Sequence, residues 1–277
     1  QGFEMSLFLD KDDLDDHLRP GQACIKPVPK PTKEASSVEV ARLDDPVLQP
    51  VQISLTDCLA CSGCVTSAES VLVERQSTAA LLRDLEVHRG GSLIVVTLSP
   101  QTRVALATRY RMEVQETAER VTGFLKGKLG VHRVFDSAFG RSLSLLESYR
   151  EYRERATAAG TLPVLTSICP GWVCYVEKTQ HTLVPHLSRV RSPLQMMGAL
   201  CKHGYLSGNL QQKIYHVAVM PCHDKKLEAS RPDFAVTDSQ QEVDCVITTG
   251  ELMQIMDAEG GLLQAERMLL DGELSLL

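Results

Sequence analysis

Residues 92–99 read SLIVVTLS, and this stretch decides the fold class. It is a continuous apolar run of the length of one strand, between two serines, which is typical of a strand buried on both faces of a parallel sheet. The segment that follows, ETAERVTGFLKGKLG at 116–130, has helical periodicity and ends at Gly130, a residue that often ends helices. Its apolar residues at helical spacing are Ala118, Val121, Leu125 and Leu129.

The same alternation continues through the rest of the chain. Further strands are predicted over VHRVFD (131–136), TLPVLTS (161–167), IYHVAVM (214–220) and VDCVITT (243–249). Further helices are predicted over 142–160, 193–203, 251–258 and the second half of 67–85. Strands that alternate with helices indicate an α/β region with a parallel sheet flanked by helices.

Composition narrows the class of protein. The 277 residues are 43% apolar and 23% charged, with a net charge of −6, which is ordinary for a globular chain of one large or two smaller domains. No large basic surface is implied, so nucleic acid is not an expected partner. No apolar run reaches membrane-spanning length, and the acidic start QGFEMSLFLDKDDLDD lacks the apolar core of a signal peptide. We therefore expect no membrane contact and a location in the cytosol or nucleus.

The chain has nine cysteines, which in a reducing compartment point to metal or redox chemistry. In DCLACSGC, Cys58, Cys61 and Cys64 stand at three-residue intervals, the spacing of iron–sulfur ligation. The next position of the ferredoxin pattern is Ala68, and Cys24 is the only other cysteine before residue 169. We predict a [4Fe–4S] cluster on these four cysteines. A zinc site, which usually takes two ligand pairs, and a purely structural triple are the less favoured alternatives.

Two later cysteines follow predicted strands. Cys169 comes after 161–167 and Cys222 after 214–220, each beside a proline. Because ligand crevices of parallel sheets lie at the carboxyl ends of the strands, both thiols are expected to face one crevice. The alternative is that they are buried thiols at strand ends. Three further cysteines are expected to be small core residues: Cys174, Cys201 and Cys245.

Several separate motifs resemble one family, in that family's order. They are DCLACSGCVTSAESVL, VFDSAFGRSLSLLES, TSICPGW, MPCHDKKLEASRPDF and DCVITTGEL. Together they closely resemble iron-only hydrogenase-like proteins of the cytosolic iron–sulfur assembly pathway, which include the nuclear prelamin A recognition factor-like group and share ancestry with [FeFe] hydrogenases. The resemblance runs from about Asp12 to about Met256. It implies a leader and ferredoxin-like cluster-binding segment over 1–90, then a hydrogenase-like α/β region with parallel sheets over 91–277.

The resemblance also implies a ligand set. The first [4Fe–4S] cluster would use the same four cysteines that the spacing indicates. A second, lying between two α/β lobes, would take Cys169 and Cys222 and two cysteines of a later motif, but no cysteine follows Cys245. We therefore expect the first part of a longer protein or a shortened form. Such a chain, taken alone, is expected to hold the first cluster firmly and the second weakly or not at all.

The function implied by the resemblance is in the assembly of cytosolic and nuclear iron–sulfur proteins. Such a protein would link an early cluster scaffold to a late targeting complex, and both would be its partners. No catalytic residues are expected. The rival functions are an [FeFe]-hydrogenase-type oxidoreductase and a nuclear protein that binds a prelamin tail.

One residue argues against the hydrogenase. Where hydrogenases have two adjacent cysteines, of which one passes protons, this chain has Ile168 before Cys169. An aliphatic side chain cannot exchange a proton, so no hydrogen turnover is expected. Lys225, Glu228 and Glu151 match hydrogenase positions that anchor the diiron unit or relay protons. The alternative is that they form ion pairs at a loop or on a solvated helix face, which is the favoured interpretation for Lys226.

Overall fold

The structure is a computed structural model that describes residues 67–157, 160–203, 213–237 and 240–271. The chain divides into two compact units, Gln1–Ser70 and Val71–Leu277. Helix α2 (Ser67–Glu74) crosses this boundary, and the fold described is that of the second unit. None of the described helices combines the length and the apolar character that crossing a membrane requires.

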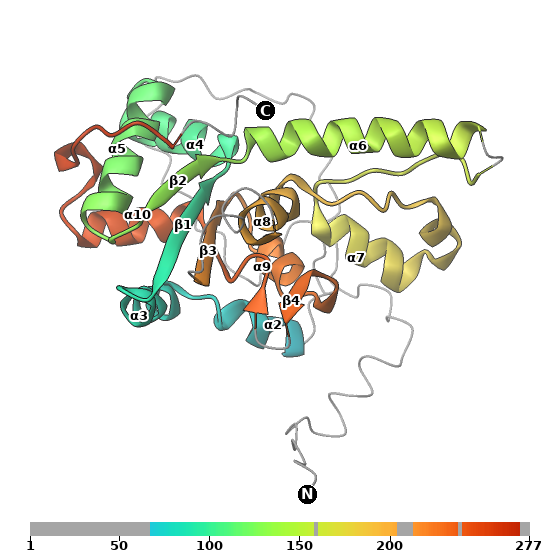
Figure 1. Ribbon diagram of the computed structural model, residues 1–277, viewed down its shortest axis with the longest axis horizontal. Helices are drawn as coiled ribbons and strands as arrows, with labels where there is room; N and C mark the ends of the chain where they lie inside the picture. Colours follow the sequence, from blue (N-terminus) through green and yellow to red (C-terminus); the bar gives the residue numbers. More distant parts are fainter. Residues whose placement is uncertain (1–66, 158–159, 204–212, 238–239, 272–277) are drawn as a thin grey trace, which may run out of the picture. The chain divides into compact units, whose positions relative to one another are not determined.

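A parallel four-stranded sheet forms the centre of the second unit, in the order β2-β1-β3-β6 (Figure 1). The strands are β1 (Ser92–Leu98), β2 (Arg133–Asp136), β3 (Lys213–Met220) and β6 (Cys245–Thr248). Strands β1 and β3 form the longest pair, with Ser92 opposite Lys213 and Leu98 opposite Val219. Strands β1, β2 and β6 fall within predicted segments, and β3 begins one residue before its predicted segment, so the α/β class is confirmed.

Helices join the strands and cover both faces of the sheet (Figure 1). They are α3 (Thr78–His88), α4 (Pro100–Tyr110), α5 (Val114–Gly127), α6 (Ala138–Thr157), α7 (Pro170–Thr179), α8 (Pro193–His203), α9 (Asp224–Ala229) and α10 (Thr249–Ala258). Short 3-10 turns lie at His181–His186, Pro232–Phe234 and Leu262–Gln264, and β4 (Ala235–Thr237) pairs antiparallel with β5 (Gln240–Gln241).

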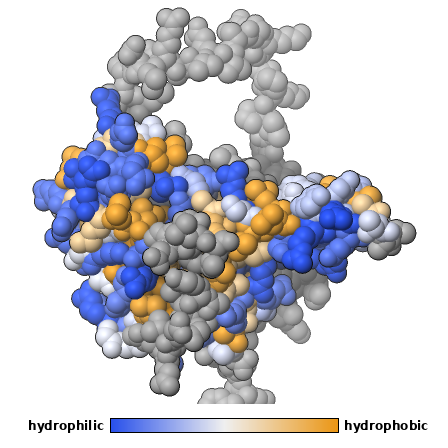
Figure 2. All heavy atoms as spheres, turned by 45° about the horizontal axis from the view of Figure 1, so that its top comes forward, coloured by the Kyte–Doolittle hydropathy of each residue, from blue (hydrophilic) through white to orange (hydrophobic). Residues whose placement is uncertain are grey.

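The central strands bury side chains on both faces, which explains their continuous apolar sequence. Successive strand residues point to opposite faces. Ile94, Val96 and Leu98 of β1 join the largest core cluster, together with α4, α5 and α10. Val95 packs on the other face, in a cluster with Met197 of α8. At the surface, Figure 2 shows apolar patches among hydrophilic residues on the face that it displays.

The strand predicted over 161–167 is wrong. Only Leu165 forms a bridge there, with Leu187, through the bonds Leu165 N–H to His186 O (2.8 Å) and Ser188 N–H to Leu165 O (2.8 Å). Pro163 cannot donate to a strand ladder. The two positions beside β1 in the sheet are taken by β2 and β3. The segment 161–167 therefore lies outside the four-stranded sheet, and its one bridge is to the irregular segment at Leu187.

A strap after α10 crosses α5 and reaches the free edge of β2. We define the strap as residues 262–271. Met268 N–H donates to Glu119 O (3.0 Å), and Asp271 N–H donates to Val134 O (2.8 Å). The Asp271 carboxylate accepts from Val134 N–H (2.8 Å). Edge strands expose unpaired backbone groups. At Val134 the strap provides a hydrogen-bond partner for both the N–H and the carbonyl.

Candidate metal centre

The cysteines predicted to hold the first iron–sulfur cluster lie outside the described residues. Cys24, Cys58, Cys61 and Cys64 all fall within 1–66, so their ligand roles stay predictions. Within the described part of the chain, no group of three or more His, Cys, Asp or Glu side chains is arranged to hold a metal ion. The structure does show the surroundings of the other two predicted ligands.

Cys169 is the N-cap residue of α7, and it does not end a sheet strand as the sequence suggested. Its N–H donates to Ser167 Oγ (3.1 Å), whose hydroxyl donates back to the Cys169 carbonyl (3.2 Å). Pro170 takes the first helical position, where its missing N–H is no loss. The half-buried thiol thus stands at the positive end of a helix, which suits an anionic sulfur ligand.

Cys222 follows β3, as the sequence predicted, and it precedes α9, which was not predicted. Its thiol is half-buried. Burial, with the nearby Asp224 carboxylate, raises the thiol pKa, while backbone N–H groups of Lys225 and Asp224 hydrogen-bond the sulfur and oppose this rise. Such N–H donors are the outer contacts that orient and tune metal-bound thiolates.

The helices that follow the two cysteines are packed together. Helix α7 lies against α9. Arg231, just beyond α9, bonds Glu177 of α7 (2.7 and 3.0 Å) and the Cys174 sulfur (3.2 Å). Cys174 is therefore half-buried beside a guanidinium, and its expected core position is wrong. Cys201 and Cys245 are buried core residues, as predicted, and burial raises both thiol pKa values to about 12.

Helix α9 carries buried ion pairs. Lys225 Nζ bonds Glu228 Oε2 at 2.6 Å, and Ser192 Oγ donates to the other oxygen of the same carboxylate. Lys226 is 1% exposed and bonds Gln76 O (2.8 Å) and Glu251 Oε1 (2.6 Å). Ion pairing is confirmed for these lysines, but the solvated helix face is wrong because all of these α9 side chains are buried.

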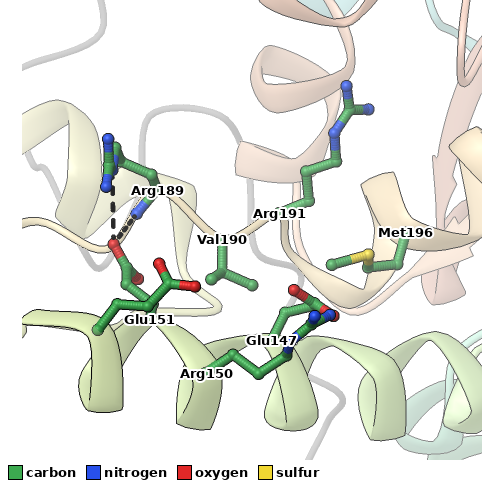
Figure 3. Close-up of a pocket in the computed structure, with 8 residues that line it drawn as sticks. Glu147, Arg150, Glu151, Arg189, Val190, Arg191 and Met196 are labelled. Carbon is green, nitrogen blue, oxygen red and sulfur yellow. Dashed lines mark hydrogen bonds and ion pairs between the residues drawn. The ribbon is translucent and has the colours of Figure 1, made fainter.

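Glu151 lies on α6 beside an open pocket of about 280 Å³ (Figure 3). Its carboxylate accepts from Arg155 Nη2 (2.5 Å), the Ser188 hydroxyl and Arg189 N–H (3.1 Å). Burial raises its pKa, but the bonds from Ser188, Arg189 and Arg155 outweigh burial and hold it below the ordinary value. Glu151 is thus held as a carboxylate. The pocket is lined by Glu147, Arg150, Glu151, Glu154, Arg189, Val190, Arg191 and Met196.

Comparison with known proteins places the chain in a family. Residues 92–268 match the family described as iron only hydrogenase large subunit, C-terminal domain. The chain belongs to this family. A solved [FeFe]-hydrogenase of Chlamydomonas reinhardtii is similar with a TM-score of 0.64 and 30% identity, over 72% of this chain and 51% of that chain. Another, studied for oxygen inactivation of its H cluster, has a TM-score of 0.64 and 29% identity, over 72% and 52%.

Curated relatives of this hydrogenase-family chain are named for iron–sulfur assembly. The mouse cytosolic iron-sulfur assembly component 3 is 46% identical, over 94% of this chain and 60% of the relative. The cytosolic Fe-S cluster assembly factor narfl of Xenopus tropicalis is 44% identical, over 90% of this chain and 57% of the relative. The chain therefore spans about 60% of the length of these relatives.

Some polar residues of this hydrogenase-family site were missed by sequence reasoning. Arg155 stands four residues after Glu151 on α6, a spacing that could have predicted the pair. Ser188 and Ser192 come from the segment before α8, and no sequence signal indicates that they reach acids on other helices. The Gln195 amide, fully buried on α8, has no hydrogen-bond partner for either of its atoms among the described residues.

A third unpartnered polar atom stands next in the chain to a predicted ligand. His223 Nδ1, next to Cys222, is buried and also lacks a hydrogen-bond partner in the described part of the chain. Buried polar atoms without partners are rare in native proteins, and a bound ion or water is one explanation for them. The half-buried Cys222 thiol and the neighbouring His223 atom therefore fit a further group bound at this loop.

Proposed function

We propose that this chain is part of an iron–sulfur protein that acts in cytosolic iron–sulfur protein assembly and does not turn over hydrogen. The observation that carries the proposal is the difference between its two kinds of relative. Named assembly components match 90–94% of the chain at 44–46% identity, whereas solved hydrogenases match 72% at 29–30%. Ile168, 54% exposed beside Cys169, supports the same assignment because it cannot carry a proton.

The finer role belongs to the same proposal and rests on the resemblance of the sequence motifs to the assembly proteins. The protein would link an early scaffold that builds clusters to a late targeting complex that delivers them, in the cytosol and also in the nucleus. Both assemblies would bind its surface. No residue of the chain is assigned a catalytic role.

Two cofactor sites belong to the proposal. Cys24, Cys58, Cys61 and Cys64 would hold one [4Fe–4S] cluster. Cys169 and Cys222 would supply two ligands of a second, supported by their free thiols, the N–H donors to Cys222 and the unpartnered His223. A bound cluster would supply one-electron redox chemistry and would tie together the segments that carry its ligands.

A rescue experiment tests the function. Cells depleted of their own cytosolic assembly relative receive this protein, and the activity of a cytosolic iron–sulfur enzyme is measured. We expect rescue by the unmodified protein and by Cys201→Ala, whose thiol is a buried core group, but not by Cys61→Ala. Hydrogen evolution above a metal-free control, with no rescue, would establish the hydrogenase alternative.

Iron counting tests the cofactor assignment separately. Iron and acid-labile sulfide are quantified after anaerobic purification of the unmodified chain, Cys61→Ala and Cys201→Ala. Cys61→Ala should lose most of the iron of the first cluster, since a ligand in the middle of the triple has no spare neighbour, and Cys201→Ala should retain it. Equal iron in both variants contradicts the ligand assignment, and zinc in place of iron contradicts the cluster.

A further inference from the structure

Helix α6 presents an apolar stripe to solvent. Leu145, Tyr149 and Tyr152 are 61%, 59% and 52% exposed, and Leu146 beside them is 59% exposed. Leu145, Tyr149 and Tyr152, together with the exposed Ala156, follow the spacing i, i+4, i+7, i+11. This spacing places them along one side of a helix. Helix α6 extends from β2 past the sheet (Figure 1), and α8 packs against it.

The spacing of the stripe is that of a helix–helix seam. Apolar residues separated alternately by four and three positions match the heptad pattern by which one helix packs against another. Isolated exposed apolar residues are ordinary, but a contiguous row of large ones marks a contact surface. Tyrosine is also a side chain in which interface binding energy concentrates.

The charges of α6 divide between its two sides. Successive residues turn by about 100° around a helix. On that geometry Arg141 and Arg153 flank the apolar stripe, and the Arg153 guanidinium lies over the Tyr149 ring, 5.9 Å from its centroid. The acids of α6 lie on the other side, where Glu147, Glu151 and Glu154 line the pocket of Figure 3. Arg150, paired with Glu147 at 2.8 Å, stands at the boundary between the two sides.

We propose that this face of α6 is a docking site for an acidic amphipathic helix of a partner protein. We define the α6 face as Leu145, Leu146, Tyr149 and Tyr152 with Arg141 and Arg153. The stripe would receive the apolar side of the partner helix, and the arginines would meet its flanking carboxylates. Charge complementarity favours such a partner over a second copy of this chain, which would bring arginine against arginine. The proposal goes beyond the proposed function and does not depend on the identity of any metal cluster.

A binding measurement with matched peptides tests the proposal. Two synthetic helical peptides carry the same leucine stripe, one flanked by glutamates and one by lysines, and their fluorescence anisotropy is followed against the full chain. The glutamate peptide should bind in the micromolar range and more weakly as salt is raised. The lysine peptide should bind at least tenfold more weakly.

Surface variants locate the site. Tyr149→Ser with Tyr152→Ser, and separately Arg141→Glu with Arg153→Glu, should each weaken the glutamate peptide at least tenfold. Val87→Ser, which changes a 78% exposed apolar residue on α3, should not. Unchanged melting temperatures check that the variants fold. Equal binding of both peptides, no binding, or equal binding by all variants contradicts the proposal. A concentration-dependent dimer in sedimentation that the tyrosine variants abolish assigns the face to a second copy instead.

Discussion

The two faces of the central sheet are built from different chemistry. On the face covered by α4 and α5, the buried polar side chains are neutral, such as Thr102, Thr117 and Thr122. Every charged residue that is buried in the described part of the chain belongs to α6, α8, α9 or the segment before β6, and we call these elements the charged face. The residues are Glu151 on α6, Lys202 on α8, Lys225, Lys226 and Glu228 on α9, and Glu242 just before β6.

This difference indicates what each face does. An apolar core stabilises the fold but sets no polar group in a particular orientation. Buried ion pairs contribute little net stability, and they hold side chains in a particular orientation only if every partner is present. Cys222 directly precedes α9, one of the elements of the charged face. The apolar side with its strap is therefore the supporting scaffold, and the charged side holds the candidate site in position.

Removal of Lys226 should have the largest effect. Lys226→Met leaves Glu251 Oε1 and the Gln76 carbonyl without the donor that lies 2.6 and 2.8 Å away. Loss of one partner of a buried pair costs about 3–5 kcal/mol, and a value near 3 is expected because the Glu251 side chain is 17% exposed. Denaturant unfolding measures it. Lys213→Met, at an exposed lysine, is the control and should change the free energy of unfolding by less than about 0.5 kcal/mol. Equal effects of both substitutions would show that the charged face is not held by this pair.

The apolar side should be most sensitive at Gly123 of α5. A Cβ there would stand 1.7 Å from the Glu266 carbonyl oxygen, so Gly123→Ala must displace the strap. Overpacking of this kind costs about 1–3 kcal/mol. Gly127 of the same helix has open space around the added Cβ, so Gly127→Ala should stabilise by up to about 1 kcal/mol through helix propensity.

Thermal melting and hydrogen exchange at the Asp271 amide distinguish the two glycine variants. Opposite signs in melting temperature, with faster exchange only in Gly123→Ala, are the expected result. If both alanines stabilise, the strap is not packed against α5 in solution, and the scaffold side of the comparison is looser than described.

The sheet was predictable from sequence because its signals are local. SLIVVTLS and IYHVAVM are largely apolar runs, and nearly all of their residues are buried. A run of this kind is typical of a strand that is buried on both faces of a sheet. Helix α4 was missed because its buried residues are only Thr102, Leu106 and Ala107, too few apolar residues to give a helical period, although Ser99 is its N-cap and Pro100 begins it. TLPVLTS has the composition of a strand, but it does not form one. Membership of the sheet depends on pairing between distant segments, and β2 and β3 take both positions beside β1.

The candidate site was less predictable than the sheet. The two cysteines stand out by residue type, and Cys222 also by its place after a strand. The pairs around them join residues far apart in the chain, such as Gln76 with Lys226 and Ser192 with Glu228. Lys226 was expected at the surface because lysine is rarely buried without a partner, and its partner Glu251 lies on another helix.

Acid should weaken the charged face through His216. This side chain is fully buried between Thr97 Oγ1 (2.8 Å) and the Glu242 carbonyl (3.1 Å), near Lys202 and Asp244, and burial lowers its pKa from 6.5 to about 4. The neutral ring contributes stability that is fully present above pH 6.5 and is lost as the pH falls toward 4. Between pH 8 and pH 5 the loss is about 2 kcal/mol.

The measurement is the pH dependence of the denaturant midpoint. His216→Gln keeps a donor and an acceptor but cannot charge, so its stability should fall less between these pH values than that of the unmodified chain. His181→Gln, at an exposed histidine of the 3-10 turn His181–His186, is the control, and its curve should follow that of the unmodified chain. Parallel curves for all three proteins would mean that His216 is solvated in solution.

The smallest effect is expected at the edge of the candidate site. Ile168 is 54% exposed, so Ile168→Cys removes little buried area and should change the free energy of unfolding by less than about 0.5 kcal/mol. It restores the thiol that hydrogenases have before the ligand cysteine, but a proton carrier accelerates a reaction only where the metal and the rest of the relay are in place. We therefore expect no hydrogen evolution from the variant, measured by gas chromatography with a strong reductant after anaerobic cluster loading. Hydrogen production by Ile168→Cys alone would mean that the charged face already forms a complete hydrogenase site and that one side chain separates the two functions.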